Sequence, residues 1–317
     1  MRLDDDGKDN RMGDRRLRQC GGVFLLGLLI SCSQTATSNS PVPIASPAPF
    51  PAKQLEYNLH QQAGAIVHTL KIPADSQFIV TTAIANPPQT VEEFAASTQA
   101  IAVLNGGFFD PKNQKSTSAV FQNGKQVAKP EDNERLMTNP DLLPYLDKIL
   151  NRSEFRRYQC GAIVQYDIAF RQGLPPGECQ LQDALGAGPQ LLPFLTSVPE
   201  GFLVVENGQT SRDALGQNQP NARSAIGLLR DGSILWVLVA QRPQAANSGL
   251  SLPELAEFMK KMGVEKGLNL DGGSSTSMFF QGETFYGKVN SAGDAIARPV
   301  KSVLLVQHTK KPEVPPR

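Results

Sequence analysis

Two segments of the chain repeat one pattern: a helix-start signal, a helix, a short apolar strand and then a pair of glycines. Residues 90 to 93 (TVEE) and 251 to 254 (SLPE) have the spacing of a capping box, which satisfies two free backbone amides at the start of a helix. Asn105-Gly106-Gly107 and Asp271-Gly272-Gly273 then occupy equivalent positions after the strands. The pattern predicts helix, strand and glycine turn in each segment. It leaves open whether the two segments arose by internal duplication.

The rest of the folded region is rich in predicted strands. Residues 65 to 72 (AIVHTLKI) and 77 to 84 (QFIVTTAI) have the alternation of strands, and residues 224 to 240 read as two paired strands around the turn Arg230-Asp231-Gly232. We interpret Asp231 as a structural turn residue. Because strands outnumber helices, we expect an α+β fold: a single mixed α/β domain from residue 55 to 307 with a strand-rich core and a few flanking helices.

The N-terminus reads as a targeting segment. Residues 1 to 31 combine basic residues with an apolar run from Val23 to Ile30, which is too short to cross a bilayer as a helix. Leu29-Ile30-Ser31-Cys32 resembles a bacterial lipobox, so we expect Cys32 to receive lipid. A plain signal peptide or membrane anchor is the alternative, and Arg15-Arg16 hints weakly at twin-arginine export. The prediction is an exported, membrane-anchored lipoprotein of the cell envelope or periplasm.

Two tails frame the predicted domain. Residues 32 to 54 are rich in Ser, Thr, Ala and Pro with almost no charge, a composition that cannot bury enough apolar surface to fold. We expect them to form a tether, with residues 308 to 317 as a C-terminal tail. Residues from about 130 to 182 are charged and read as an insertion, either a cap over the substrate pocket or a surface addition without a role.

The remaining cysteines predict a structural disulfide. Cys160 and Cys179 lie in a polar region, and an exported domain permits a disulfide between them. A metal site would need more ligands, and the three histidines show no ligand spacing with the cysteines or each other. We therefore predict no metal and no cofactor.

Charge excludes some classes of partner. Lys plus Arg total 31 and Asp plus Glu total 30, so no basic excess indicates nucleic-acid binding. A nucleotide P-loop and the G-x-S-x-G of serine hydrolases are also absent from the sequence. The sequence does not predict the oligomeric state.

Asp271 is the candidate catalytic residue. The simple interpretation of both glycine pairs is a tight hairpin, since Asn-Gly and Asp-Gly are common turn signals. A hairpin does not explain why small hydroxyl residues, among them Ser275 and Thr276, follow the second pair. Carboxylate, accessible amides and hydroxyls together suit an oxygen-rich ligand. Arg223, at the start of a predicted strand, could bind a phosphate or form a surface ion pair.

Five ordered stretches resemble the motifs of one family: AVLNGGFFD, ALGAGPQLL, NARSAIGLLRDG, LNLDGGSSTSM and ARPVKSVLLV. They resemble, over most of residues 60 to 307, the phosphodiester glycosidase family, typified by the enzyme that removes N-acetylglucosamine from phosphodiester-linked mannose. The resemblance implies cleavage between an anomeric carbon and a phosphate. With the second glycine of each turn included, it implies a site lined by Asn105, Gly106, Gly107, Arg223, Asp271, Gly272, Gly273, Ser275, Thr276 and Arg298.

The implied chemistry assigns roles to these residues. A carboxylate such as Asp271 can stabilise an oxocarbenium-like state, attack it, or activate water. Arg223, with Arg298 nearby, would bind the departing phosphate. Asp110 is the nearest second carboxylate, although it could merely bond its own turn. Two hypotheses follow: an envelope hydrolase of sugar phosphodiesters, and a noncatalytic glycan-binding or exopolysaccharide-assembly lipoprotein.

Overall fold

The computed structural model describes residues 53 to 243, 245 and 247 to 309. The predicted signal segment, Cys32 and nearly all of the tether and the C-terminal tail lie outside the described residues. None of the helices in the described part of the chain has both the length and the hydrophobicity needed to cross a membrane.

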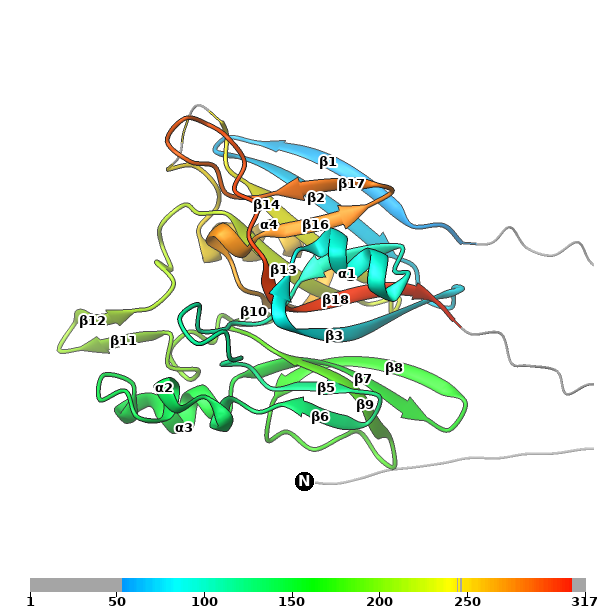
Figure 1. The fold of residues 1–317 in the computed structure, drawn as a ribbon, viewed down its shortest axis with the longest axis horizontal. Helices are drawn as coiled ribbons and strands as arrows, with labels where there is room; N and C mark the ends of the chain where they lie inside the picture. The colour runs from blue at the N-terminus through cyan, green and yellow to red at the C-terminus, as the bar shows by residue number, and fades with distance from the viewer. Residues whose placement is uncertain (1–52, 244, 246, 310–317) are drawn as a thin grey trace, which may run out of the picture. The chain divides into compact units, whose positions relative to one another are not determined.

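Three antiparallel sheets and one small hairpin make up the domain (Figure 1). The first sheet has the order β1 (Glu56–Gln62), β2 (Ala65–Ile72), β14 (Ile234–Ala240), β13 (Arg223–Leu229), β15 (Val264–Asn269), β10 (Gln190–Leu192). The second has the order β17 (Glu283–Tyr286), β16 (Ser277–Phe280), β4 (Ala102–Asn105), β18 (Val300–His308), β3 (Phe78–Gln89). The third has the order β6 (Lys125–Ala128), β5 (Val120–Gln122), β9 (Gln180–Gly186), β7 (Ser153–Cys160), β8 (Ile163–Phe170). The hairpin pairs β11 (Leu203–Glu206) with β12 (Gln209–Asp213).

Helices are few and short. The α-helices are α1 (Val91–Thr98), α2 (Glu134–Met137), α3 (Leu146–Leu150) and α4 (Leu252–Lys261), and the 3₁₀ turns are η1 (Pro130–Asp132), η2 (Leu143–Tyr145) and η3 (Gly273–Ser275). Strands account for 46% and helices for 14% of the structure. The predicted strand-rich core is confirmed. The predicted α+β class needs correction, because the domain is mostly β.

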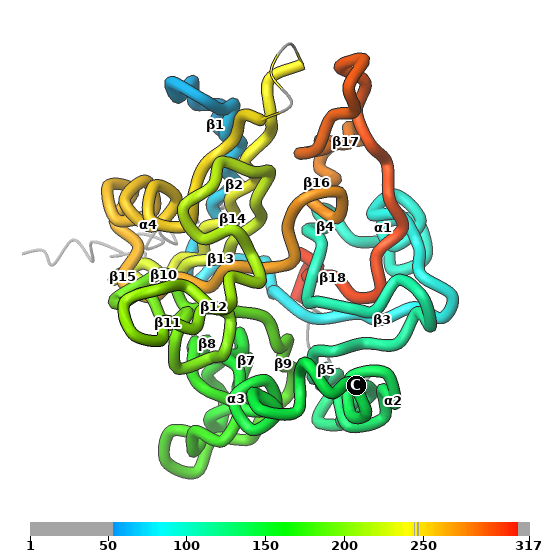
Figure 2. The backbone as a smooth tube through the Cα atoms, turned by 90° about the vertical axis from the view of Figure 1, so that its left-hand side faces the viewer, coloured from blue at the N-terminus to red at the C-terminus, as the bar shows by residue number. Residues whose placement is uncertain are grey.

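One core joins the three sheets. Trp236 of the first sheet, Leu104 of the second and Phe155 of the third are all fully buried in the same apolar cluster. The outer face of the first sheet packs against α4, and that of the second packs against α1. Figure 2 shows these two helices on opposite outer sides, with the third sheet below the other two. Burial of these faces is the main force that fixes the sheets to one another.

Both capping boxes are confirmed. The Thr90 hydroxyl accepts the Glu93 N–H while the Glu93 carboxylate accepts the Thr90 N–H, and Ser251 and Glu254 form the same reciprocal pair. The helices therefore begin where the sequence predicts.

The predicted pairing of β13 with β14 is also confirmed, through a turn in which Gly232 has a φ of 80°. Asp231 has the structural role expected of it, because its Oδ1 accepts the Ser233 N–H at 2.9 Å. That hydrogen bond is the largest influence on the pKa of Asp231, which lies below its ordinary value.

The segment predicted as an insertion is part of the folded core. Its strand β7 lies between β9 and β8, and Phe155 and Ile168 from these strands belong to the shared apolar cluster. The strands of this segment are therefore not a surface addition, and its alternative role as a cap over a substrate pocket stays a prediction. The charged residues of this stretch suggested a position at the surface. In the structure, arginines of β7 are buried because they form ion pairs, such as that of Arg157 with Asp183.

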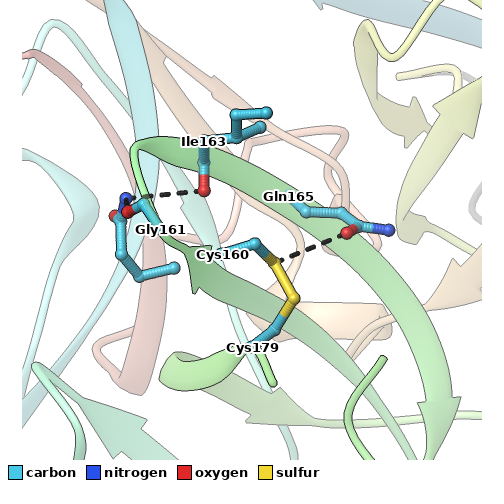
Figure 3. The surroundings of a disulfide bond; sticks show 6 residues. Cys160, Gly161, Ile163, Gln165 and Cys179 are labelled. Atoms are coloured by element: carbon cyan, nitrogen blue, oxygen red, sulfur yellow. Dashed lines mark hydrogen bonds between the residues drawn. A yellow bond between two sulfur atoms is a disulfide. The ribbon is translucent and has the colours of Figure 1, made fainter. Parts of the chain in front are cut away.

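The predicted disulfide is confirmed. The Sγ atoms of Cys160 and Cys179 are 1.95 Å apart (Figure 3). Cys160 ends β7, next to the turn at Gly161 that leads into β8. The bond therefore fixes the end of the β7–β8 hairpin to the chain that enters β9.

Candidate functional site

The two glycine turns lie where the chain crosses from one sheet to another. β4 of the second sheet leads to β5 of the third, and β15 of the first leads to β16 of the second. The hairpin interpretation of the turns was therefore wrong. The crossings meet: the Asp271 N–H donates to the Gly106 carbonyl at 3.0 Å, and Asn105 Nδ2 donates to the Asp271 carbonyl at 2.7 Å.

Asn105 holds this junction together. Its side chain is fully buried, and its Oδ1 accepts the Ser224 hydroxyl at 2.6 Å and the Ser277 N–H at 3.1 Å. With the bond to the Asp271 carbonyl, one amide connects three chain segments. Since its side chain is fully buried and both its oxygen and its nitrogen bind protein groups, Asn105 positions Asp271, and its predicted contact with substrate stays a prediction.

The glycines of the first turn allow close backbone approach. A Cβ on Gly106 would lie 2.6 Å from the Ser302 carbonyl oxygen, and one on Gly107 would lie 2.3 Å from the Gly186 carbonyl oxygen. Real Cβ contacts are longer, so no other residue fits without movement of the backbone. The amides of this turn already donate to Ser302, through its carbonyl at 2.8 Å and its hydroxyl at 3.2 Å.

The second turn is built in the same way. Gly273 has a φ of 61°, a left-handed conformation that favours glycine, and its N–H donates to the Ala222 carbonyl at 2.9 Å. A Cβ on Gly272 would lie 3.0 Å from that carbonyl oxygen. The expected cradle of free amides around a phosphate is therefore not formed by Gly106, Gly107 and Gly273, whose N–H groups bind protein.

Asp271 is the perturbed acid of the junction. Its side chain is partly buried, and burial raises its pKa to about 6. The nearby Ser275 hydroxyl, the charge of Arg298 and the Gly272 N–H act in the opposite direction and limit the rise. Near neutral pH the carboxylate is thus mostly ionised but held in a site that penalises its charge. Such perturbed acids are typical of functional sites.

Two buried hydroxyls follow Asp271 in the turn. Thr276 Oγ1 makes no hydrogen bond within the described structure, and the Ser275 hydroxyl has the Asp271 carboxylate, whose pKa it lowers, as its neighbour. The residues that hold them are 1% and 0% exposed. A buried polar atom left unpaired costs roughly 1–3 kcal/mol. Because both residues have almost no exposed surface, their predicted contact with a substrate stays a prediction.

Arg298 is the cation of the site. Its Nη1 donates to the Ser274 hydroxyl at 2.8 Å, and its guanidinium carbon is 5.0 Å from the centre of the Phe109 ring. The first contact ties Arg298 to the turn of Asp271, and the second ties it to the turn of Asn105. It is half-buried and keeps further donors for a ligand.

The backbone of Arg223 lies next to the turn of Asp271, at Gly272. The guanidinium group of Arg223, however, already donates hydrogen bonds to backbone carbonyls. Nε donates to the Leu250 carbonyl at 3.2 Å, and the terminal nitrogens donate to the carbonyls of Leu215, Gly216 and Gln219 at 3.0 to 3.1 Å. Burial lowers its pKa to about 10, and the charge of Asp213 opposes this. This arrangement favours a structural role: Arg223 holds residues 215 to 219 in place. Its predicted role as phosphate clamp stays a prediction.

Asp110 forms a turn on the surface side of the first crossing. Its Oδ1 accepts the Lys112 N–H at 2.8 Å, and its Oδ2 pairs with Arg135 at 2.7 Å. Burial acts to raise its pKa, but these hydrogen bonds and the arginine charge together lower it. An acid with a lowered pKa is a poor proton donor near neutral pH, so the geometry favours the turn interpretation that the sequence left open.

Several functional positions were not predicted. Ser224 and Ser302 hold the junction through the hydrogen bonds given above, and Phe109 packs under Arg298. Each lies inside one of the sequence stretches quoted for the resemblance, so motif membership was the available signal. Among the described residues, no group of three or more His, Cys, Asp or Glu side chains could hold a metal ion.

The larger surface hollows lie elsewhere. One of about 830 Å³ is lined by Leu250 and Phe258, one of about 730 Å³ by Glu131 and Arg171, and one of about 650 Å³ by Ile163, among others; none of the three is lined by Asp271. Size alone would select these hollows. We place the candidate site at Asp271 because the perturbed acid and the half-buried arginine, Arg298, occur together there.

The protein is thus a mostly-β domain in which the carboxylate of Asp271 and the guanidinium of Arg298 lie where the chain crosses between sheets. The phosphodiester glycosidase family profile matches residues 98 to 307, and the chain belongs to this family. None of the curated protein sequences compared with the chain matches it.

Solved structures share the fold. The catalytic domain of zebrafish N-acetylglucosamine-1-phosphodiester alpha-N-acetylglucosaminidase, auto-inhibited by its pro-peptide, is 19% identical with a TM-score of 0.58, over 86% of each chain. A hypothetical protein from Synechocystis is also 19% identical, with a TM-score of 0.52, and the match covers 80% of this chain and 61% of the other. At these identities the comparison shows the fold alone.

Proposed function

We propose that the domain hydrolyses the bond between the anomeric carbon of a sugar and a phosphate in a glycan phosphodiester. The observation that carries the proposal is the pairing, within one junction, of Asp271 with its raised pKa and Arg298. The family supports the same reaction class, as does the fold shared with the zebrafish glycosidase.

Asp271 would act on the sugar side of the bond. As the bond breaks, positive charge develops at the anomeric carbon, and an ionised carboxylate stabilises it, attacks it, or takes a proton from the attacking water. The water oxygen ends bonded to the anomeric carbon, and the electron pair of the broken bond stays on the phosphate oxygen. Phosphate is a good leaving group, so this cleavage does not require a second acid.

Arg298 would act on the phosphate side. A guanidinium with free donors binds phosphate oxygens and gains strength as negative charge develops on them. For this role the proposal favours Arg298 over the predicted Arg223, because the guanidinium of Arg223 already donates to four backbone carbonyls. Arg223 would support the site by fixing the loop that enters β13.

The sequence pattern supports a place for this reaction outside the cytoplasm. In the proposal, residues 1 to 31 direct export, Cys32 carries a lipid anchor in the membrane, and residues 32 to 54 tether the domain. Envelope or extracellular glycans with sugar phosphodiesters are then the substrates within reach, exopolysaccharides among them.

A noncatalytic glycan-binding or exopolysaccharide-assembly protein is the second candidate. One observation favours it: Asp110, the second carboxylate that the sequence offered, is bound to Arg135 and does not supply an acid to the junction. The domain would then keep the sugar-phosphate site and lack turnover.

Turnover decides between the candidates. We would measure sugar release from an N-acetylglucosamine 1-phosphate diester and from a panel of other sugar-1-phosphate diesters. In Arg298→Gln we expect kcat/KM to fall by roughly 10²- to 10³-fold, the loss typical of one electrostatic contact in the transition state. The control is Arg230→Gln, whose side chain is 90% exposed at the β13–β14 turn and should stay within about twofold.

Two results would contradict the proposal. No release from any diester of the panel by the unmutated protein would favour the binding protein. Equal losses in Arg298→Gln and Arg230→Gln would show that the substrate responds to surface charge in general and that Arg298 has no special place in the site.

A further inference from the structure

Arg152 lies beside the first glycine turn, outside the residues assigned to the site so far. Its guanidinium carbon is 3.6 Å from the centre of the Phe202 ring and 5.9 Å from that of Phe108. Phe108 is two positions after Gly106, whose carbonyl accepts the Asp271 N–H. Since consecutive Cα atoms are about 3.8 Å apart, Phe108 is anchored within roughly 8 Å of that contact. The arginine and its aromatic rings therefore adjoin the catalytic junction.

A second arginine is held in the same manner. Arg152 Nε donates to the Glu200 carbonyl at 3.1 Å, and Arg212 Nε donates to the carbonyl of the next residue, Gly201, at 3.0 Å. The guanidinium carbon of Arg212 is 5.1 Å from the centre of the Tyr145 ring. Each guanidinium is thus fixed by one backbone carbonyl and by at least one aromatic ring. Stacking of this kind holds the planar group in place before any ligand binds.

The two charges are not neutralised by ion pairs. Neither Arg152 nor Arg212 forms a salt bridge with any residue that the structure describes, and their terminal nitrogens make no hydrogen bond there. Burial lowers the pKa of Arg152 to about 9; the attraction of Glu200 opposes this, and the charge of Arg212, a smaller effect, adds to the lowering. That carboxylate is itself occupied, because it accepts the N–H and hydroxyl of Ser153 and the N–H of Gln190.

The Glu200 carboxylate offsets part of the repulsion between the two arginines, but it forms no hydrogen bond with either guanidinium, so a bound anion would add both charge balance and the missing contacts. Guanidinium groups bind phosphate through parallel hydrogen bonds, and both arginines keep the terminal nitrogens that such binding needs. A phosphate between them would take up these donors.

We propose that Arg152 and Arg212 bind a second phosphate of the substrate, on the same glycan as the phosphodiester that is cleaved. This rests on the proposed function and narrows its substrate class to glycans with more than one phosphate. The same guanidinium pair would also accept free inorganic phosphate, so the test separates the two sources.

The first arm of the test measures binding without turnover. Inorganic phosphate is titrated calorimetrically into the full-chain protein, into Arg152→Gln and Arg212→Gln, and into the control Arg230→Gln. We expect either single variant to weaken binding at least tenfold and the control to stay within twofold. Equal affinities in all four proteins would overturn the proposal. Thermal unfolding would reveal a variant that fails to fold, and the other single variant would then still test the proposal.

The second arm measures KM for two diesters of the same sugar, one with a neutral aglycone and one whose aglycone carries a further phosphate. We expect Arg152→Gln to raise KM about tenfold for the phosphorylated diester and less than threefold for the neutral one. Unchanged KM values for both, with phosphate binding lost, would overturn the assignment to substrate and identify a site for free phosphate. Absence of turnover in the unmutated protein would refute the proposed function, while the binding arm would still decide whether the arginine pair binds phosphate.

Discussion

Replacing Asp271 by asparagine separates the electrostatic cost of this carboxylate from its chemical contribution. Burial raises the pKa of Asp271 from 3.8 to about 6. Between these values the folded protein binds more protons than the unfolded chain, so its free energy of unfolding falls as the pH rises through this window. At 1.36 kcal/mol per pKa unit, the loss reaches about 3 kcal/mol above pH 6. Asparagine carries no charge and avoids this loss.

The expected result is a variant that is more stable and less active. By urea unfolding, Asp271→Asn should exceed the unmutated protein in free energy of unfolding by up to about 3 kcal/mol at pH 8 and match it near pH 4. Turnover should fall by roughly 10²- to 10⁴-fold, the range for loss of a catalytic acid or base. Because the ionised form of Asp271 is the active one in the proposed reaction, turnover of the unmutated protein should rise with pH through about 6.

Asp110→Asn is the matched control, since Asp110 follows the equivalent glycine turn. Its pKa is lowered, so its charge stabilises the fold above the ordinary Asp pKa, and that contribution is lost as the pH falls. Asp110→Asn should therefore lose stability at pH 8, where Asp271→Asn gains it. A loss of stability at pH 8 in both variants would refute the electrostatic reasoning, and unchanged turnover in Asp271→Asn would refute its catalytic role.

Three further predictions concern the junction and the hairpin that the disulfide closes. Asn105→Ala should lower the free energy of unfolding by roughly 2–4 kcal/mol in urea, because it leaves buried partners unpaired on three chain segments. Gly107→Ala should prevent soluble expression or lower the melting temperature sharply, because its Cβ would lie 2.3 Å from the Gly186 carbonyl oxygen. Replacing Cys160 and Cys179 together by serine should cost about 3 kcal/mol in the same urea assay, the loop-closure contribution for their separation of 19 residues.

Each of these has a discriminating outcome. Gly64→Ala is the control for the glycine substitution, since the nearest atom to its Cβ would be at an ordinary 3.4 Å, and a similar loss in it would contradict the steric argument. A cost below about 0.5 kcal/mol for Asn105→Ala would show that the unpaired partners find water or each other. For the cysteines, equal stability with and without reductant would show that the hairpin end is fixed by β-pairing alone.

The local elements were predictable because their signals are local. A capping box needs four consecutive residues, and a two-strand pairing around Asp231 needs about seventeen, so propensity and hydrogen-bond chemistry within one stretch decide the outcome. The partnership of the three sheets was not predictable in this way. It depends on which apolar faces meet, and Trp236, Leu104 and Phe155, which share the core, are far apart in sequence.

The candidate site was also predictable only in its local features. The sequence predicted Asp271 and Asn105 as equivalent positions after two strands, and the structure brings them into contact. It did not predict that the two turns cross between sheets. An Asn-Gly or Asp-Gly pair has the same local propensity in a hairpin and in a crossing, and only the pairing partners of the next strand distinguish the two. β5 and β16 each pair in a sheet other than that of the strand before the turn.

Arg223 and Arg298 show why residue type could not assign the phosphate clamp. Both are arginines within the matched motifs, and both sit beside the turn of Asp271. They differ in what their guanidinium groups have to satisfy. Arg223 is 3% exposed, so its donors need protein acceptors, and the carbonyls of the 215 to 219 loop and of Leu250 supply them. Arg298 is half-buried and has one side-chain hydrogen bond, so it keeps donors for a ligand. The distinction depends on burial and on the loop that folds over the side chain, and neither is encoded in the residues next to the arginine.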